Sequence, residues 1–228
     1  MATKSASMQR GDVTKEALIA SAIAVFARDG FHAVSTRDIA HISGVNQALI
    51  GYHFRNKEGL YLAVFEHIAK QINARIGPLA DAIEAALEPG PAVAARSEAA
   101  DTYLLHLLRL TDGMTGMLAQ ENFAAWAQLI TREQQAPTAA FEVLYDGFMK
   151  RVLGLMTRLI LRIRGSDDEA AARLTTATIL GQILVFRACR TGMLRHMAWS
   201  EVSDPELAAI QRQIRRNVTA ILISKDTE

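Results

Sequence analysis

Apolar residues recur at intervals of three and four along almost the whole chain, which is the period of a helix with one buried face. In the first such segment, residues 14–29, Leu18, Ile23 and Phe26 share one face, and Gly30 follows as a left-handed residue that ends the helix. Alternation of apolar and polar residues with a period of two is absent, and Gly and Pro are sparse. The pattern predicts an all-α protein.

Two much shorter helices are predicted directly after the first. Ser35 and Asp38 have the spacing of a capping box and begin one of them, which Gly44 ends. Asn46 caps the other, over 47–53. A short helix, a glycine turn and a second short helix form the helix-turn-helix plan, in which the second helix enters a major groove of DNA.

The polar side chains of this second short helix suit contact with DNA. Gln47 can pair with an adenine edge through its amide. The side chains that supply donors for phosphate are Tyr52, His53, Arg55 and Lys57. Lys57 also lies at the start of the following helix, where unpaired N–H groups favour an anion. The alternative is a helical corner whose polar side chains only face solvent.

The rest of the chain is predicted to form longer helices. One begins after Asn56 and ends near Pro78. The later segments are 79–88, 92–111, 117–135, 138–164 (capped by Thr138), 169–197 and a last helix that begins at Ser203. Nothing in this part repeats, so we expect one N-terminal head, residues 10–60, followed by one helical domain, residues 61–224.

Composition excludes several classes of protein. The net charge of the 228 residues is +1, so no overall basic field indicates nucleic acid, although residues 1–60 hold seven basic and five acidic residues. Cys189 is the one cysteine and cannot form an internal disulfide. The first residues lack the apolar segment of a signal peptide, and no apolar run reaches the length of a membrane span. No catalytic set, metal-ligand spacing or cofactor motif is present. We expect a cytoplasmic protein that is not an enzyme and that uses no membrane, metal or cofactor.

Residues 14–61 resemble the N-terminal DNA-binding domain of the TetR family of bacterial transcriptional regulators. The segment that carries the resemblance is SAIAVFARDGFHAVSTRDIAHISGVNQALIGYHFRNKEGLY, residues 21–61. The resemblance implies that DNA is contacted by Thr36, Arg37, Asn46, Gln47, Ala48, Tyr52, His53 and Lys57. One departure is Gly51, because the family usually has Tyr there; one phosphate contact is then missing, and the neighbouring Tyr52 is the candidate substitute.

The C-terminal part is similar to the family over one segment. LITREQQAPTAAFEVLYDGFM, residues 129–149, resembles the C-terminal domain of the CecR-type subgroup of these regulators. Within it, Arg132, Glu133 and Gln134 lie close to an apolar helix end. They are candidate polar hooks for a ligand, and a structural ion pair or helix cap is the alternative.

The resemblance also implies a homodimer, and two helices offer a surface for it. On the 138–164 helix the candidate interface residues are Tyr145, Phe148, Val152, Leu155 and Leu159, which recur at intervals of three and four. On the next helix Gly181 and Ala188 belong to a seam of small residues that lets a partner helix approach closely. The alternative is that both helices are buried within a monomer.

A ligand pocket is predicted from large, adaptable apolar side chains in the C-terminal domain. They are Tyr103, His106, Met114, Met117, Phe123, Trp126 and Phe141. Methionine-rich walls suit adaptable cavities, and small-molecule sites have volumes of ~300 Å³ or more. The alternative is that these residues form plain core.

Together these features predict a DNA-binding transcriptional regulator, in the first place a repressor. We expect it to hold a palindromic operator in double-stranded DNA as a homodimer and to release it when a small apolar or amphipathic effector binds. One alternative replaces the effector by a protein partner or by none. A second alternative is a helical enzyme or carrier with a vestigial head.

Overall fold

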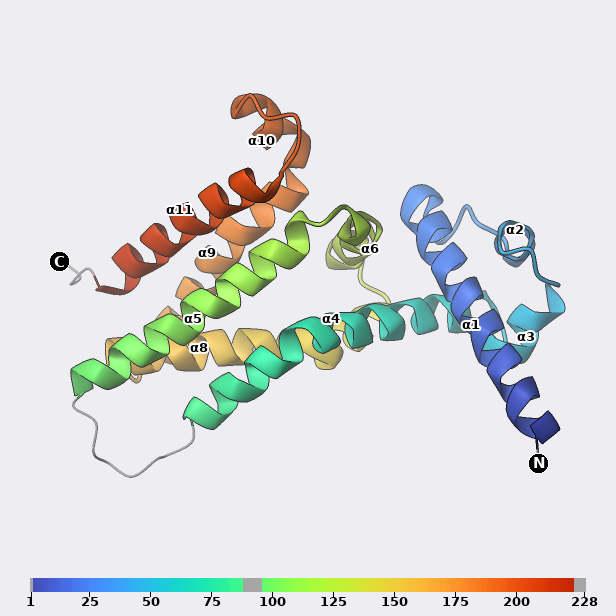
Figure 1. The fold of residues 1–228 in the computed structure, drawn as a ribbon, viewed down its shortest axis with the longest axis horizontal. Helices are drawn as coiled ribbons and strands as arrows, with labels where there is room; N and C mark the ends of the chain where they lie inside the picture. Colours follow the sequence, from blue (N-terminus) through green and yellow to red (C-terminus); the bar gives the residue numbers. More distant parts are fainter. Residues whose placement is uncertain (1, 88–95, 224–228) are drawn as a thin grey trace. The chain divides into compact units, whose positions relative to one another are not determined.

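A computed structural model describes residues 2–87 and 96–223, and every regular element in these ranges is a helix, as the periodicity predicts. None of the described helices has the combination of length and hydropathy that crossing a membrane requires. The chain divides into two compact units (Figure 1). Unit 1 consists of residues 1–71 and 125–148, and unit 2 of residues 72–124 and 149–228. The expected boundary between residues 60 and 61 stays a prediction.

Unit 1 is built around a cluster of aromatic side chains. Its helices are α1 (Ala2–Asp29), α2 (Thr36–Ile42), α3 (Ala48–Phe54), the first part of α4 (Lys57–Leu87), most of α6 (Ala124–Gln135) and α7 (Ala139–Leu144). Phe26 and Phe65 are fully buried, and the Tyr61 ring lies edge-on to both, with centroids 5.1 and 4.9 Å away. Gly30 has a φ of +84° and ends α1, as predicted.

The predicted end of the fourth helix near Pro78 is wrong, because α4 continues through Pro78 to Leu87. A proline inside a helix removes one hydrogen bond and costs ~3 kcal/mol. In α4, Ile76, Ala80 and Ile83 are all nearly inaccessible to solvent on either side of the proline. Burial of this apolar face offsets the local cost, so the helix persists.

The predicted continuous helix over 138–164 contains an irregular turn. After α7 a π-helix, Tyr145–Met149, precedes α8 (Lys150–Arg164). A Cβ added at Gly147 would lie 2.9 Å from the Cβ of Ala69, so the glycine permits close approach of this turn to α4. A π turn inserts one extra residue and rotates the faces before and after it relative to each other.

Unit 2 contains α5 (Arg96–Ala119), α8, α9 (Glu169–Ala188), α10 (Arg190–His196) and α11 (Asp204–Ile223). Helices α5, α8, α9 and α11 pack against one another (Figure 1). The core between them includes Leu107, Ile160, Ile179 and Val218, each fully buried. A short 3₁₀ helix, Glu121–Phe123, connects α5 to α6. The predicted 169–197 helix breaks at Cys189, which is exposed between α9 and α10.

Candidate DNA-binding site and effector cavity

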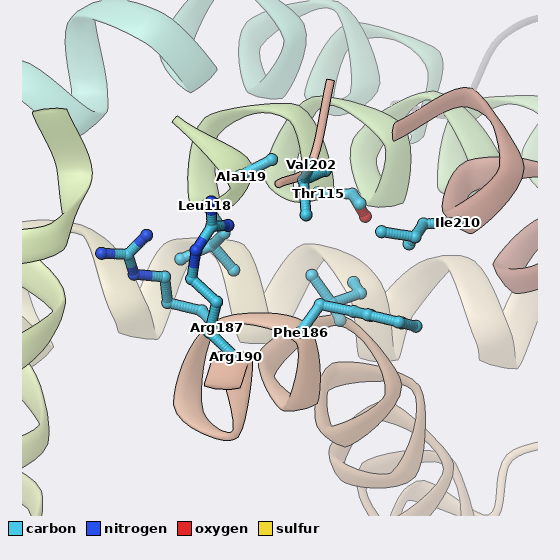
Figure 2. A pocket seen from close by; sticks show the side chains of 9 residues that line it. Thr115, Leu118, Ala119, Phe186, Arg187, Arg190, Val202 and Ile210 are labelled. Atoms are coloured by element: carbon cyan, nitrogen blue, oxygen red, sulfur yellow. The ribbon is translucent and has the colours of Figure 1, made fainter. Parts of the chain in front are cut away.

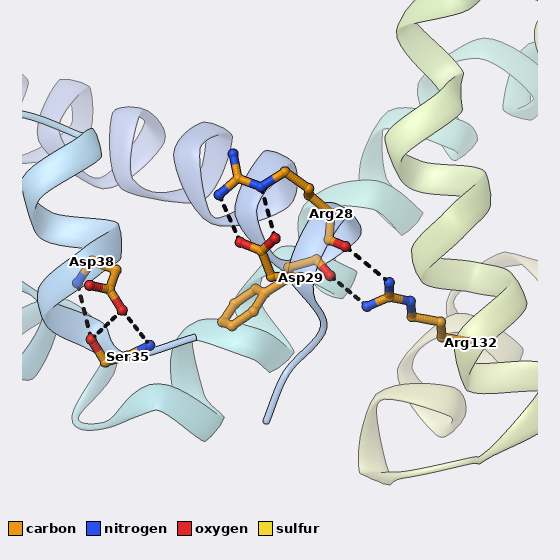
Figure 3. Close-up of polar contacts among 6 residues, drawn as sticks. Arg28, Asp29, Ser35, Asp38 and Arg132 are labelled. Carbon is orange, nitrogen blue, oxygen red and sulfur yellow. Dashed lines mark hydrogen bonds and ion pairs between the residues drawn. The ribbon is translucent and has the colours of Figure 1, made fainter. Parts of the chain in front are cut away.

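Helix α2 begins at a complete capping box, as predicted (Figure 3). The Ser35 hydroxyl accepts from the Asp38 backbone N–H at 3.2 Å, and the Asp38 carboxylate accepts from the Ser35 backbone N–H at 3.0 Å. The Ser35 hydroxyl also donates to the Asp38 carboxylate at 2.6 Å, and this bond, together with that from the Ser35 backbone N–H, holds the pKa of the Asp38 carboxyl below its usual value. Ile39 and Ala40 of α2 are buried, whereas Ile42, the last residue of the helix, is 52% exposed.

The turn between α2 and α3 has the geometry that the glycine predicts. Gly44 has a φ of +67°, which non-glycine residues adopt only with strain. The Val45 backbone N–H donates to the Ala40 carbonyl at 3.0 Å and closes the turn. The Asn46 side-chain oxygen accepts from the Ala48 backbone N–H at 2.8 Å, so Asn46 caps the start of α3.

Gln47 is exposed at the start of α3 and is already oriented by a neighbour. Its side-chain N–H donates to the Thr36 hydroxyl at 3.0 Å. An amide nitrogen carries two N–H groups, so one N–H and the carbonyl oxygen remain for a base edge. Two residues predicted to contact DNA are thereby brought together, and the contact restricts the rotamers of Gln47.

Lys57, which was predicted to contact phosphate, also makes contacts within the protein. Its ammonium donates to the Val34 carbonyl at 2.9 Å and lies 4.4 Å from the centre of the Phe31 ring. Lys57 is half-buried and connects the start of α4 to the loop before α2. An ammonium carries three N–H donors, so phosphate contact remains available, and it stays a prediction.

The other predicted contact residues lie on or beside the helix-turn-helix. Arg37, Asn46 and Ala48 are exposed, Thr36 and His53 are half-buried, and Tyr52 is 82% exposed. The Tyr52 ring lies edge-on to His53, with centroids 4.9 Å apart. A Cβ added at Gly51 would meet nothing within 4 Å, so a side chain fits there.

The end of α3 has a tight turn that sequence spacing did not indicate. Arg55 has a φ of +71° and a ψ of −54°, and the Asn56 backbone N–H donates to the Phe54 carbonyl at 2.9 Å. This is a γ-turn with positive φ, which is strained for a residue other than glycine. A Cβ added at Gly59 would lie 2.0 Å from the Phe54 oxygen, so the start of α4 needs a glycine at this position.

Arg132 and Glu133 connect α6 to the helix-turn-helix head within unit 1. The Arg132 guanidinium donates to the Phe26 carbonyl at 3.0 Å and to the Arg28 carbonyl at 3.4 Å, at the end of α1 (Figure 3). The Glu133 carboxylate, 2% exposed, accepts from the Tyr61 hydroxyl at 2.8 Å and from Thr138. Burial and this hydrogen bond raise the pKa of Tyr61. Of the two alternatives left open, the structural contact is the one observed for both.

Comparison with known proteins agrees with this geometry. The sequence model of bacterial regulatory proteins of the tetR family matches residues 18–64, and that of the C-terminal domain of the HTH-type transcriptional dual regulator CecR matches residues 105–223. CecR of Shigella flexneri is 32% identical over 215 residues, which cover 93% of both chains. The chain belongs to the TetR family.

Two further proteins are similar over different extents. The transcriptional repressor NicS of Pseudomonas putida is 32% identical over 65 residues, 28% of this chain and 31% of NicS. A crystal structure of a TetR-family regulator from Mesorhizobium loti superposes with a TM-score of 0.59 at 19% identity, covering 93% of this chain and 96% of that one. This TetR-family protein is therefore a DNA-binding transcriptional regulator and, by family, not an enzyme.

The residues predicted to line an effector pocket are divided between the two units of this TetR-family regulator. Tyr103, His106, Met114, Met117 and Phe123 lie in unit 2, and Trp126 and Phe141 lie in unit 1. Within unit 2, Met114, Met117 and Phe123 are buried, whereas Tyr103 and His106 are half-buried. The Trp126 ring lies edge-on to His67 at 6.3 Å. Their role in a pocket stays a prediction.

A different set of residues lines the cavity that unit 2 contains (Figure 2). They are Thr115, Leu118, Ala119, Ile183, Phe186, Arg187, Arg190, Val202 and Ile210. The cavity volume is about 10 Å³, room for a single water molecule and far below the expected size of a small-molecule site. This cavity was not predicted from the sequence, because its lining comes from several helices that only the fold brings together.

The α8 residues predicted at a dimer interface are mostly covered within the protomer. Val152, Leu155 and Leu159 are 7%, 2% and 0% exposed, so they have almost no surface left for a partner. Tyr145 is 37% exposed and Phe148 half-buried, and both lie in the π-helix that precedes α8. The predicted interface stripe is therefore divided between the π-helix and α8.

Helix α9 has the exposed apolar surface that α8 lacks. Gly181 and Ala188 are exposed, as a seam of small residues requires. The full stripe, at intervals of four and three, is Ala170, Leu174, Ala177, Gly181, Leu184 and Ala188. Leu174 is 68% and Leu184 40% exposed, and a Cβ at Gly181 would meet nothing within 4 Å. We call this surface the α9 face.

Proposed function

We propose that this regulator binds a palindromic operator as a homodimer, represses transcription from it, and releases it when a small molecule binds unit 2. The observation that carries the DNA-binding part is the oriented Gln47 amide at the exposed start of α3. An amide in that position can pair with an adenine edge in a major groove. The names of relatives support regulation in either direction, since CecR is called a dual regulator and NicS a repressor.

The α9 face supports the homodimer. A contiguous apolar surface on a described helix indicates a protein interface, and the small residues at its centre allow two helices to approach closely. A twofold-symmetric dimer presents two copies of α3, which explains a palindromic operator. We assign the interface to α9 rather than to Val152, Leu155 and Leu159.

The experiment is selection of operator fragments by the purified protein, followed by titration of the selected DNA and of scrambled DNA at several salt concentrations. Gln47→Ala is expected to lose ~1–3 kcal/mol of discrimination at its base pair, with the salt slope nearly unchanged. Arg37→Ala is the matched backbone probe, since Arg37 is exposed. It is expected to weaken all sequences alike and to lower the slope of log K against log salt by ~2 for a dimer.

Lys57→Ala is a less clean probe than Arg37→Ala, because the ammonium also contacts the Val34 carbonyl and the Phe31 ring. A loss of affinity in that variant would mix a lost phosphate contact with a loosened head.

Selection that enriches no sequence, or a Gln47→Ala variant with wild-type discrimination at every position, would remove α3 as the reading helix.

A further inference from the structure

Two arginines border the apolar cavity of unit 2. Arg187 lies at the end of α9 and Arg190 at the start of α10, and their guanidinium groups lie at the same end of the cavity (Figure 2). The rest of the lining is mainly apolar and includes Leu118, Ile183 and Phe186. The pKa of Arg187 is lowered, chiefly because burial disfavours its charge and also because Arg190 is close.

The positive charge of this pair is incompletely compensated. The Nη1 atoms of Arg187 and Arg190 are buried and have no hydrogen-bond partner among the described residues. Glu121 pairs with Arg190 at 2.5 Å, but its side chain is 73% exposed, whereas that of Arg190 is 20% exposed. One mostly solvated carboxylate thus faces two partly desolvated guanidiniums. Buried donors without a partner are costly, and an anion would relieve that cost.

We propose that the effector is a small organic carboxylate whose head group is held by Arg187 and Arg190. This rests on the proposed function and names the chemical class of its ligand. The planar guanidinium fork matches a carboxylate by two parallel hydrogen bonds. The apolar walls favour a ligand with a hydrocarbon part over an inorganic anion. Because the cavity has room for only one water molecule, side chains such as Leu118 and Phe186 must move to admit the hydrocarbon.

The position of Glu121 connects this site to the reading head through the chain. A ligand carboxylate would compete with Glu121 for Arg190, and Glu121 begins the 3₁₀ helix that leads into α6. Helix α6 carries Arg132, which holds the carbonyls at the end of α1. Release of Glu121 would therefore remove one of the contacts that hold the segment from which α6 starts. A ligand shifts an equilibrium only by its differential affinity for two states, and loss of this ion pair supplies such a difference.

The experiment is calorimetric titration of the full-length protein with acetate, butanoate and hexanoate, compared with hexan-1-ol and inorganic phosphate. Affinity is expected to rise from acetate to hexanoate and to exceed that for either hexan-1-ol or phosphate by at least tenfold. Arg187→Met and Arg190→Met keep an unbranched apolar stem without the guanidinium and are expected to lower hexanoate affinity at least tenfold. Arg195→Met is the matched control on α10, because Arg195 is exposed, and is expected to bind like wild type.

Glu121→Gln leaves both arginines in place and removes the competing charge, so it is expected to bind hexanoate several-fold more tightly than wild type. That result separates a ligand site from an ion pair with only a structural role. Equal affinity for hexan-1-ol and hexanoate, equal affinity for phosphate, no binding at all, or wild-type affinity in folded Arg187→Met would each overturn the assignment. Operator binding without any carboxylate affinity would overturn this inference alone and leave the proposed function intact.

Discussion

The Thr36 hydroxyl and the Gln47 amide join α2 to α3 on the exposed side of the glycine turn. Such a contact reduces the number of rotamers that the amide must give up on binding DNA, so part of the entropic cost of recognition is met before binding. At the residue scale, the Gln47 amide is thus oriented before binding by Thr36, which is itself predicted to contact DNA.

Thr36→Val removes the hydroxyl at nearly constant shape, and we expect it to lower discrimination at the base pair read by Gln47 by ~1 kcal/mol. Thr36→Ser keeps the hydroxyl and is the matched control. The measurement is the ratio of affinities for operators that differ at that base pair. Equal ratios in the valine and serine variants would mean that Gln47 is oriented by the DNA alone.

Gly51 offers a second test at this scale. Gly51→Tyr introduces the residue usual in the family at a position with open space. We expect several-fold tighter binding to all DNA sequences with little change in salt slope, because a phenol donates a hydrogen bond of ~1 kcal/mol without adding charge. Gly51→Ala separates helix propensity from this contact: it should raise stability by ~0.5–1 kcal/mol without tightening DNA binding. Identical affinities of the two variants would refute the contact.

At the element scale, α6 belongs with the head through hydrogen bonds to the end of α1. The last carbonyls of a helix lack intrahelical partners, and a cation near them also interacts favourably with the helix dipole. Gly30, which ends α1, leaves room for this arrangement, because a Cβ there would lie 2.6 Å from Arg132 Nη1. One side chain of α6 therefore supports the helix end that Gly30 sets.

Arg132→Met is expected to lower the stability of the head by ~1 kcal/mol, a value reduced from that of a buried charged hydrogen bond because Arg132 is largely exposed. Hydrogen exchange at the end of α1 should become faster. Gln135→Met, at the exposed end of the same helix, is the control. Unchanged exchange in Arg132→Met would show that α1 ends without help from α6.

Capping residues in the sequence predicted where several helices begin. Sequence patterns did not predict the features that depend on packing between helices. Ser35, Asn46, Asn56 and Thr138 all cap as expected, since a cap needs only a side chain and the next turn. The continuation of α4 through Pro78 and the π-helix at Gly147 depend on neighbours distant in sequence. The cavity arginines depend on them too, because their burial comes from α5 and α11 residues.

At the scale of the whole molecule, the net charge of +1 gives little long-range attraction to DNA, so in the proposed dimer two correctly spaced heads would supply the affinity. That spacing depends on how two protomers meet. The α9 face meets this need with surface that is exposed in one protomer, whereas the α8 stripe is already used in its core.

Leu174→Glu combined with Leu184→Glu is expected to give a monomer, because dimerisation through the α9 face would bury the new charges. The helix content is expected to stay unchanged, because both side chains are exposed in the protomer. Leu105→Glu, at a leucine of α5 that is 43% exposed, is the matched control and should remain dimeric. Light scattering gives the mass and circular dichroism the helix content. A dimer in the double variant would place the interface elsewhere.

The contact between Gly59 and the Phe54 oxygen limits how this head can diverge. A Cβ at residue 59 collides with backbone rather than with a flexible side chain, so a saturation library scored for folding should retain almost nothing but glycine there. The strained turn at Arg55 lies between the end of α3 and this required glycine in α4. The end of α3 is therefore fixed, and with it the length and direction of the helix. New operator preferences can arise by exchange of side chains along α3, but lengthening the reading helix would require a different junction.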